Sequence, residues 1–183
     1  MHGDIGNNQN SMSLASLARR TFSSAAAPAS VLVVGAGHVG TWLACTLARG
    51  GARVTLKYEP AFFEAQRDAV CRAAGVTPAA SFEEVESQVE YLFVSTKTYH
   101  HASVAAELQD APAAARPSRA AVLCHNGFVD YETVWGAAMG AGAGVEYFKA
   151  LVPGGYTFNP ELEDGFAVTN AGQPWSLGAR AHA

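Results

Sequence analysis

The chain has 183 residues, which is enough for one domain, or for one domain with extensions. A hydrophobic fraction of 49% and a charged fraction of 15% are typical of a globular protein with a true core. The net charge of −4 gives no electrostatic footprint for nucleic acid. The sequence also has no apolar run of about 18 residues that could span a bilayer.

Residues 1–30 differ in composition from the rest of the chain. They contain Arg19 and Arg20, many Ser and Ala residues, and Asp4 as the only acid. A leader rich in Arg and Ser is typical of a mitochondrial or plastid transit peptide, and residues 18–24 are similar to a mitochondrial processing site. The alternative is an ordinary disordered tail. We therefore expect a targeting leader or linker over residues 1–30, with a mitochondrial location, or otherwise a cytoplasmic one.

From residue 31 onward, short apolar runs that predict strands alternate with stretches that predict helices. The predicted strands are 31–34, 54–56, 91–94, 120–124 and 145–151. The predicted helices are 41–49, 61–74 (following Pro60), 81–84, 99–108 and 131–139. Repeated strand–helix units predict a doubly wound, mostly parallel α/β sheet of the Rossmann type, with helices on both faces.

The last part of the chain has a different pattern. Residues 166–169 and 175–177 flank the turn-like stretch 170–173, which predicts a β-hairpin. The sequence therefore predicts one domain over residues 31–178 that ends in a C-terminal β-hairpin, with residues 179–183 as a tail.

The cysteines and histidines match neither a disulfide framework nor a metal site, so we predict no metal. The cysteines lie in predicted core elements, where this residue behaves as a small hydrophobe: Cys45, Cys71 and Cys124. The histidines of the predicted domain, interpreted as surface or turn residues, are His38, His100, His101 and His125.

The strongest motif is Gly35-Ala36-Gly37-His38-Val39-Gly40, which matches G-x-G-x-x-G. It follows a buried strand and opens a helix, and this context makes it a dinucleotide-binding fingerprint. Gly35 would permit the tight turn, Gly37 would let the backbone approach a pyrophosphate, and Gly40 would let the helix pack closely. The N–H groups at the start of the helix would bind the anion.

The end of the second strand bears on the choice between NAD and NADP. Glu59 lies 19 residues after Gly40, near the spacing at which an acid bonds the ribose 2′-hydroxyl, and therefore favours NAD. Lys57 lies on the same side of the strand, where it could pair with Glu59 or meet a 2′-phosphate. The choice between NAD and NADP stays open at this point.

Beyond the glycine turn, three motifs resemble the ketopantoate reductase (2-dehydropantoate 2-reductase) family. They are the strand and lysine at 92–99, the strand ending in Asn126-Gly127, and the β segments from residue 154 to 178. The resemblance implies an oxidoreductase of the pantothenate biosynthesis pathway that reduces a 2-keto acid to a 2-hydroxy acid with NAD or, as is usual in the family, NADP. It also implies that Lys97 and Asn126 contact the cofactor and act in catalysis.

In that family a helical domain follows, which carries the general-acid lysine and a substrate-binding carboxylate. The chain stops at Ala183, so we expect the lone chain to bind the cofactor and to catalyse poorly, because hydride transfer needs a proton donor and a closed cleft. A partner polypeptide could supply the missing helical half. The alternative function is a non-catalytic nucleotide-binding or structural subunit of a mitochondrial assembly.

Overall fold

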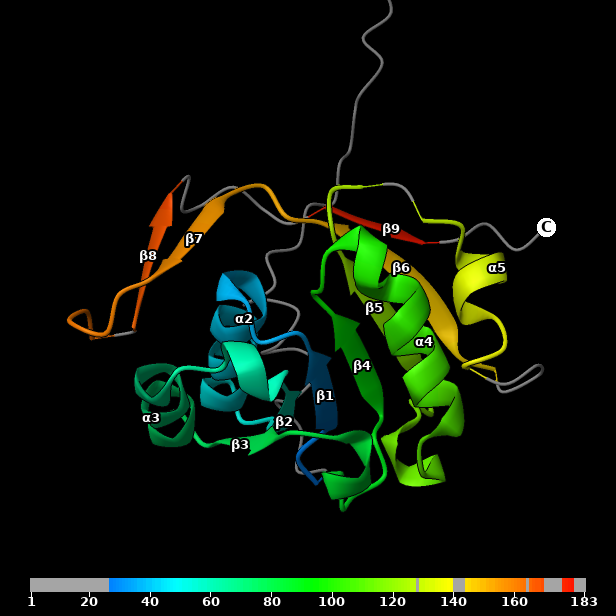
Figure 1. The fold of residues 1–183 in the computed structure, drawn as a ribbon, viewed down its shortest axis with the longest axis horizontal. Helices are drawn as coiled ribbons and strands as arrows, with labels where there is room; N and C mark the ends of the chain where they lie inside the picture. The colour runs from blue at the N-terminus through cyan, green and yellow to red at the C-terminus, as the bar shows by residue number, and fades with distance from the viewer. Residues whose placement is uncertain (1–26, 128, 140–143, 164, 170–175, 180–183) are drawn as a thin grey trace, which may run out of the picture.

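The computed structural model describes residues 27–127, 129–139, 144–163, 165–169 and 176–179. Within these residues a seven-stranded sheet has the order β3-β2-β1-β4-β5-β6-β9 (Figure 1). Its strands are β1 (Ser30–Val34), β2 (Arg53–Lys57), β3 (Val76–Ala79), β4 (Tyr91–Val94), β5 (Ala120–Cys124), β6 (Glu146–Leu151) and β9 (Ser176–Ala179). The first six pair in parallel, and β9 runs antiparallel to β6. The predicted Rossmann sheet is confirmed.

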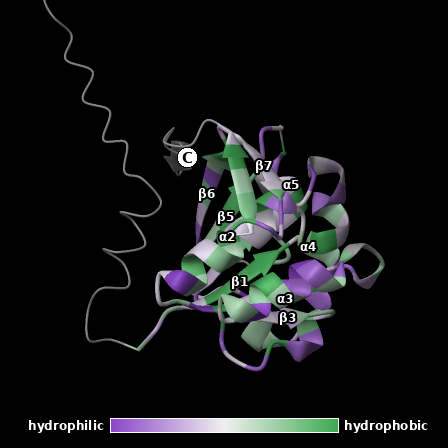
Figure 2. Cartoon of the chain, turned by 90° about the vertical axis from the view of Figure 1, so that its left-hand side faces the viewer, coloured by the Kyte–Doolittle hydropathy of each residue, from purple (hydrophilic) through white to green (hydrophobic). Residues whose placement is uncertain are grey.

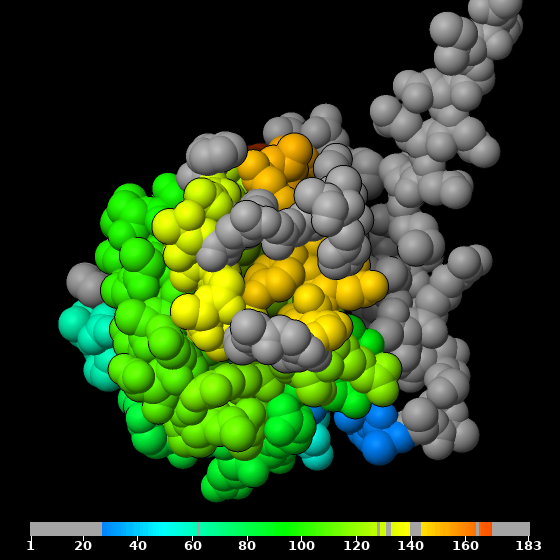
Figure 3. All heavy atoms as spheres, turned by 90° about the vertical axis from the view of Figure 1, so that its right-hand side faces the viewer, coloured from blue at the N-terminus to red at the C-terminus, as the bar shows by residue number. Residues whose placement is uncertain are grey.

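Helices cover both faces of this sheet. They are α2 (His38–Arg49), α3 (Ala65–Ala73), α4 (His101–Asp110) and α5 (Tyr131–Trp135). Helices α2 and α3 lie on one side, and α4 and α5 lie on the other (Figure 1). Figure 3 shows the second side, where α4 and α5 form the surface beside β6.

The central strand β1 explains why both faces must be covered. Successive side chains of a strand point to opposite faces, and every residue of β1 is buried. Val31 and Val33 join the core under α2 and α3, whereas Leu32 and Val34 join the core under α4 and α5. In Figure 2 the hydrophobic colouring is concentrated on such central strands, and hydrophilic residues lie on the outer surface of α3.

The predicted helix over 61–74 is wrong in part. A 3-10 turn covers Pro60–Phe62, the backbone is then extended at Phe63 and Glu64, and α3 starts at Ala65. The Phe63 ring, which lies in this extended stretch, stacks on Tyr58 with centroids 4.3 Å apart. The stop at Gly75 is confirmed, because this glycine has a φ of +82°.

The sequence reading missed strand β3. It contains Pro78, which argues against a strand because proline has no N–H to donate. The structure places β3 at the edge of the sheet, where it pairs only with β2. An edge strand tolerates proline because one side of its ladder needs no partner.

The other predicted helices are confirmed with shifted ends. The 81–84 segment is a 3-10 turn over Phe82–Glu84. Another 3-10 turn, Thr98–His100, precedes α4, and α5 ends at Trp135 instead of residue 139.

A C-terminal β-hairpin is present, but only one of its two strands, residues 166–169, is among those predicted for it. Strand β8 (Phe166–Thr169) pairs antiparallel with β7 (Gly155–Phe158) in a separate two-stranded sheet. The second predicted strand, 175–177, instead overlaps β9 of the main sheet, while its turn residues lie outside the described part of the chain. Strand β7 packs on α2, with the Tyr156 and Trp42 rings 4.6 Å apart.

The three cysteines are buried and unbridged, as predicted. Cys45 of α2 and Cys71 of α3 share a hydrogen bond, which lowers the pKa of Cys45 and raises that of Cys71. No helix in the described residues is long and apolar enough to cross a membrane.

Candidate functional site

The glycine turn lies between β1 and α2, at the carboxyl edge of the sheet. Gly35 has a φ of +102°, and a Cβ built there would lie 2.8 Å from Thr96 Cγ2. A Cβ at Gly40 would collide with the Gly35 carbonyl oxygen and with Ser95 Oγ. These two glycines therefore permit the turn and the close packing of α2, as the motif predicted.

Gly37 differs from the other two glycines because nothing lies within 4 Å of a Cβ built there. It is the N-cap of α2, has ordinary extended backbone angles, and provides no side-chain cap. The first-turn N–H groups of a helix have no intrahelical partner, and the first turn of α2 contains no acid. The start of α2 therefore offers free donors and a positive dipole end to an anion.

Hydrogen bonds fix the shape of this turn. Ser95 Oγ lies 2.8 Å from the Gly35 carbonyl oxygen, and Gly35 N donates to the Lys57 carbonyl at 3.0 Å. The Ala36 carbonyl accepts from Thr41 Oγ1 at 3.1 Å and from Arg67 at 2.7 Å. The turn is thus preorganised by the ends of three strands and by two helices.

The other two residues of the motif support the same turn. His38 Nδ1 lies 2.9 Å from the Tyr156 carbonyl oxygen, which ties the first turn of α2 to β7. Val39 is partly buried and packs against the core under α2.

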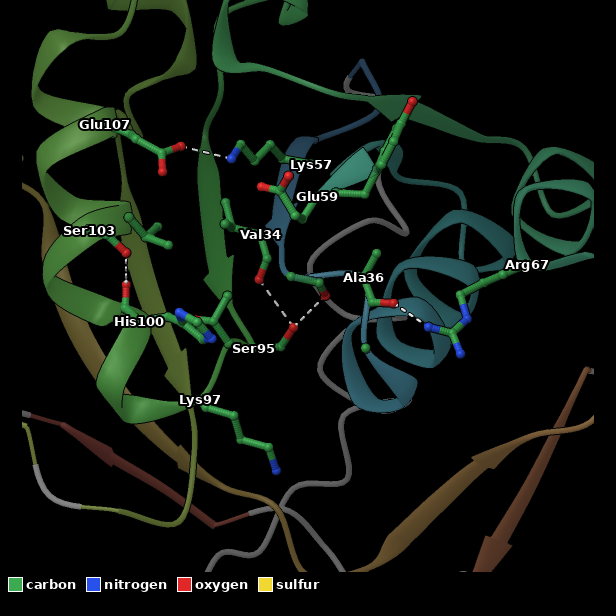
Figure 4. A pocket seen from close by; sticks show the side chains of 15 residues that line it. Val34, Ala36, Lys57, Glu59, Arg67, Ser95, Lys97, His100, Ser103 and Glu107 are labelled. Carbon is green, nitrogen blue, oxygen red and sulfur yellow. Dashed lines mark hydrogen bonds and ion pairs between the residues drawn. The ribbon is translucent and has the colours of Figure 1, made fainter. Parts of the chain in front are cut away.

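A pocket of about 330 Å³ opens beside the turn (Figure 4). It is lined by segments 34–37, 57–59 and 95–97, by Arg67 of α3, and by residues of α4 and of the turn before it. This volume is in the range of small-molecule sites, which commonly lie at the carboxyl ends of strands in open α/β sheets. Among the residues predicted to bind the cofactor, Glu59, Lys57 and Lys97 line this pocket together with the glycine turn.

Lys57 does not pair with Glu59, which was one of the alternatives. Its Nζ lies 2.8 Å from Oε2 of Glu107 on α4, and it also faces the Phe82 ring at 5.2 Å from the centroid. Glu59 is exposed at the end of β2 and lines the same pocket.

The two residues expected to act in catalysis lie at different places. Lys97 is exposed and lines the pocket. The Asn126 side chain is not among the pocket residues and bridges to the backbone of Val152: its Nδ2 donates to the carbonyl at 3.0 Å, and its Oδ1 accepts from the N–H at 2.9 Å. These bonds hold the end of β5 to the end of β6, so this amide has a clear structural role.

Arg67 is a residue that the sequence reading missed. It is buried on α3, donates to the Ala36 carbonyl, and faces the Phe158 ring at 5.2 Å from the centroid. Figure 4 shows its guanidinium reaching toward Ala36. No sequence signal marks it, because an arginine in a polar amphipathic helix is usually solvated.

The interpretation of the histidines as surface or turn residues is wrong for two of them. His101 and His125 are 1% and 6% exposed, and their rings meet edge to face with centroids 4.8 Å apart. His101 Nδ1 accepts a hydrogen bond from Trp135 Nε1 at 3.3 Å. Burial, and then the neighbouring His125, lower the pKa of His101 to about 4; burial also lowers the pKa of His125. Both rings are therefore neutral at pH 7 and belong to the core beneath α4.

Together, the strand order 3-2-1-4-5-6 and a glycine turn that opens a helix at the carboxyl edge define a Rossmann domain of the dinucleotide-binding class. The family model for ketopantoate reductase PanE/ApbA matches residues 31–145. The chain therefore belongs to the ketopantoate reductase family, as its motifs predicted. No curated protein sequence matches the chain.

Solved structures share the fold. A Bacteroides fragilis protein described as an NADP oxidoreductase is 18% identical with a TM-score of 0.54, and the match covers 84% of this chain and 52% of that one. A Pseudomonas putida protein described as an oxidoreductase is 21% identical with a TM-score of 0.50, and the match covers 75% of this chain and 44% of that one. An imine reductase from Aspergillus terreus, in complex with NADPH4 and dibenz[c,e]azepine, is 17% identical with a TM-score of 0.50, over 70% and 42%. The chain thus spans about half the length of these proteins.

Proposed function

We propose that this chain is the nicotinamide-dinucleotide-binding part of a reductase that converts a 2-keto acid to a 2-hydroxy acid. The observation that carries the proposal is the open N-terminus of α2, where Gly37 leaves room within 4 Å and no acid occupies the first turn. A pyrophosphate fits this cradle because it would accept hydrogen bonds from free N–H groups and complement the helix dipole.

The residues around the pocket have separate roles in this proposal. The backbone of residues 35–40 binds the pyrophosphate, and the end of β2 with Glu59 receives the adenosine ribose. When bound, the reduced nicotinamide supplies a hydride for the keto carbon. Lys97, which is exposed beside the pocket, attracts the carboxylate of an anionic 2-keto acid.

Asn126 is proposed, from the family resemblance, to lie beside the nicotinamide. Its amide is held by the Val152 backbone, and such bonds would fix its orientation toward a ligand. The proton donor for the developing alkoxide is not assigned to any described residue. We therefore expect the lone chain to bind the cofactor and to turn over slowly or not at all.

The test is calorimetric titration of the full chain with NADH and with NADPH, followed by an assay of NADH or NADPH oxidation with ketopantoate. Binding of at least one nucleotide supports the proposal, and ketopantoate turnover would identify the substrate. A folded chain that binds neither nucleotide would contradict it and would favour a purely structural role for the fold.

A further inference from the structure

The Lys57–Glu107 ion pair crosses the pocket wall between two elements that are far apart in sequence. Lys57 is the last residue of β2, and Glu107 lies on α4. The side chain of Lys57 is 11% exposed and that of Glu107 is 51% exposed. Figure 4 shows the two side chains directed toward each other above the glycine turn, with Glu59 close by.

Lys57 is held in place more firmly than a typical surface lysine. Its ammonium group contacts Glu107 on one side and faces the Phe82 ring on another, and its stem is buried. A buried stem and a paired head limit the rotamers that the side chain can adopt. A new anionic partner for Lys57 would therefore have to compete with a carboxylate that is already bound.

This position matters because the end of β2 is where a Rossmann domain receives the adenosine ribose. Lys57, Glu59 and Glu107 line this part of the pocket, and their formal charges sum to −1. A ribose with a free 2′-hydroxyl can donate a hydrogen bond to a carboxylate there. A 2′-phosphate, which carries a charge of about −1.5 to −2, would meet two carboxylates and a lysine whose charge is already neutralised.

We propose that Glu107 is a selectivity residue that makes this site prefer NAD over NADP by occupying Lys57. The proposal rests on the dinucleotide-binding function proposed above. In this arrangement Lys57, which by itself would favour a 2′-phosphate, supports an NAD site instead. Glu107 thus acts through Lys57 in addition to repelling the phosphate directly.

The test is to measure dissociation constants for NADH and NADPH by calorimetry on the full chain and on Glu107→Gln. Glutamine keeps the size of the side chain and removes its charge, so the charge of Lys57 is no longer neutralised. We expect the affinity for NADPH to rise about tenfold or more, while the affinity for NADH changes by less than about threefold. Adding Lys57→Met to Glu107→Gln should reverse most of this gain.

The matched control is Glu90→Gln. Glu90 pairs with Arg119 at 3.6 Å at the start of β4, which is the opposite edge of the sheet from the pocket, and its removal changes the net charge by the same amount. Glu90→Gln should leave the ratio of the two affinities unchanged. Thermal unfolding of each variant checks that the fold is retained; the exposed Glu90–Arg119 pair contributes at most about 1 kcal/mol, so its loss should not unfold the chain.

The outcomes separate this inference from the proposed function. If the wild-type chain binds neither nucleotide, the proposed function fails. If it binds nucleotide but Glu107→Gln leaves the affinity ratio unchanged, or Glu90→Gln changes it equally, the assignment of Glu107 is overturned. The assignment is also overturned if most of the gain survives the loss of Lys57, because the main effect would then not pass through that residue.

Discussion

Substitution of Gly37 separates folding from cofactor binding at the glycine turn. Gly37 has φ of −69° and ψ of −177°, which any residue can adopt, and a Cβ there meets nothing within 4 Å. Aspartate is also a preferred N-cap residue, stabilising a helix by a few tenths of a kcal/mol relative to glycine. Gly37→Asp should therefore fold with unchanged or slightly higher thermal stability.

The same substitution should abolish binding. A carboxylate about 5 Å from a phosphate charge is repelled by about 3 kcal/mol for each pair of charges at an effective dielectric constant of about 20. We expect the affinity for both NADH and NADPH to fall at least about a hundredfold.

Calorimetric titration measures this loss, and thermal unfolding on the same samples measures stability. Gly37→Asn is the control, because asparagine has the size and capping ability of aspartate without its charge. It should bind more tightly than Gly37→Asp, and the difference measures the electrostatic part. Retained affinity in a folded Gly37→Asp would refute the assignment of this turn as the pyrophosphate site.

Three further predictions concern other parts of the chain. Arg67→Met should lower the affinity for both nucleotides about tenfold and lower the melting temperature, because the Ala36 carbonyl loses a charge-assisted hydrogen bond worth about 1.5–3 kcal/mol. Arg72→Met, at an exposed position on the same helix, should change neither the affinities nor the melting temperature. Equal effects of the two substitutions would contradict this role of Arg67. The pKa of His101 is about 4 in the folded chain and about 6.5 in the unfolded chain. Between these pH values the unfolded state binds more protons than the folded state. The free energy of unfolding therefore falls by up to about 3 kcal/mol as the pH falls from about 6.5 to 4. Urea midpoints at pH 7.5 and 5 should therefore converge in His101→Gln, and an unchanged difference would show that other groups control it. Finally, we propose that residues 1–30 direct mitochondrial import; a reporter fused to them should be mitochondrial, and a diffuse cytosolic signal would end this proposal.

Features that depend on local sequence were predicted well. The alternation of apolar runs with helical stretches identified five of the strands. The signal is clearest for β1, β4 and β5, which are almost entirely buried and therefore almost continuously apolar. The turn at residues 35–40 was recognised from its glycine spacing, because the tight turn and the close packing of the helix each require a glycine at a fixed position. The positive φ of Gly35 and the close approach at Gly40 confirm these two requirements. The family followed from short motifs, two of which, at Lys97 and at Asn126-Gly127, come just after a strand.

Features that depend on distant contacts were decided only by the tertiary structure. Strand β3 is stable because it pairs with β2 at an edge, although Pro78 argues locally against it. The hairpin partner of β8 is β7, and a hairpin pattern alone does not state which neighbouring strand will pair. The burial of His101 likewise depends on its packing against Trp135, which lies in another helix.

The candidate site also combines features that depend on local sequence with features that depend on distant contacts. The fold, the glycine turn and the strand end at which Lys57 and Glu59 lie can be predicted from the sequence alone, because they follow from periodicity and from the conformational freedom of glycine. Only the tertiary structure decided that Lys57 pairs with Glu107, 50 residues away, and that Arg67 supports the turn from α3. Charged side chains on helices have the same local pattern whether they face solvent or a pocket, so the packing of the helices against the sheet decides which of them reach the site.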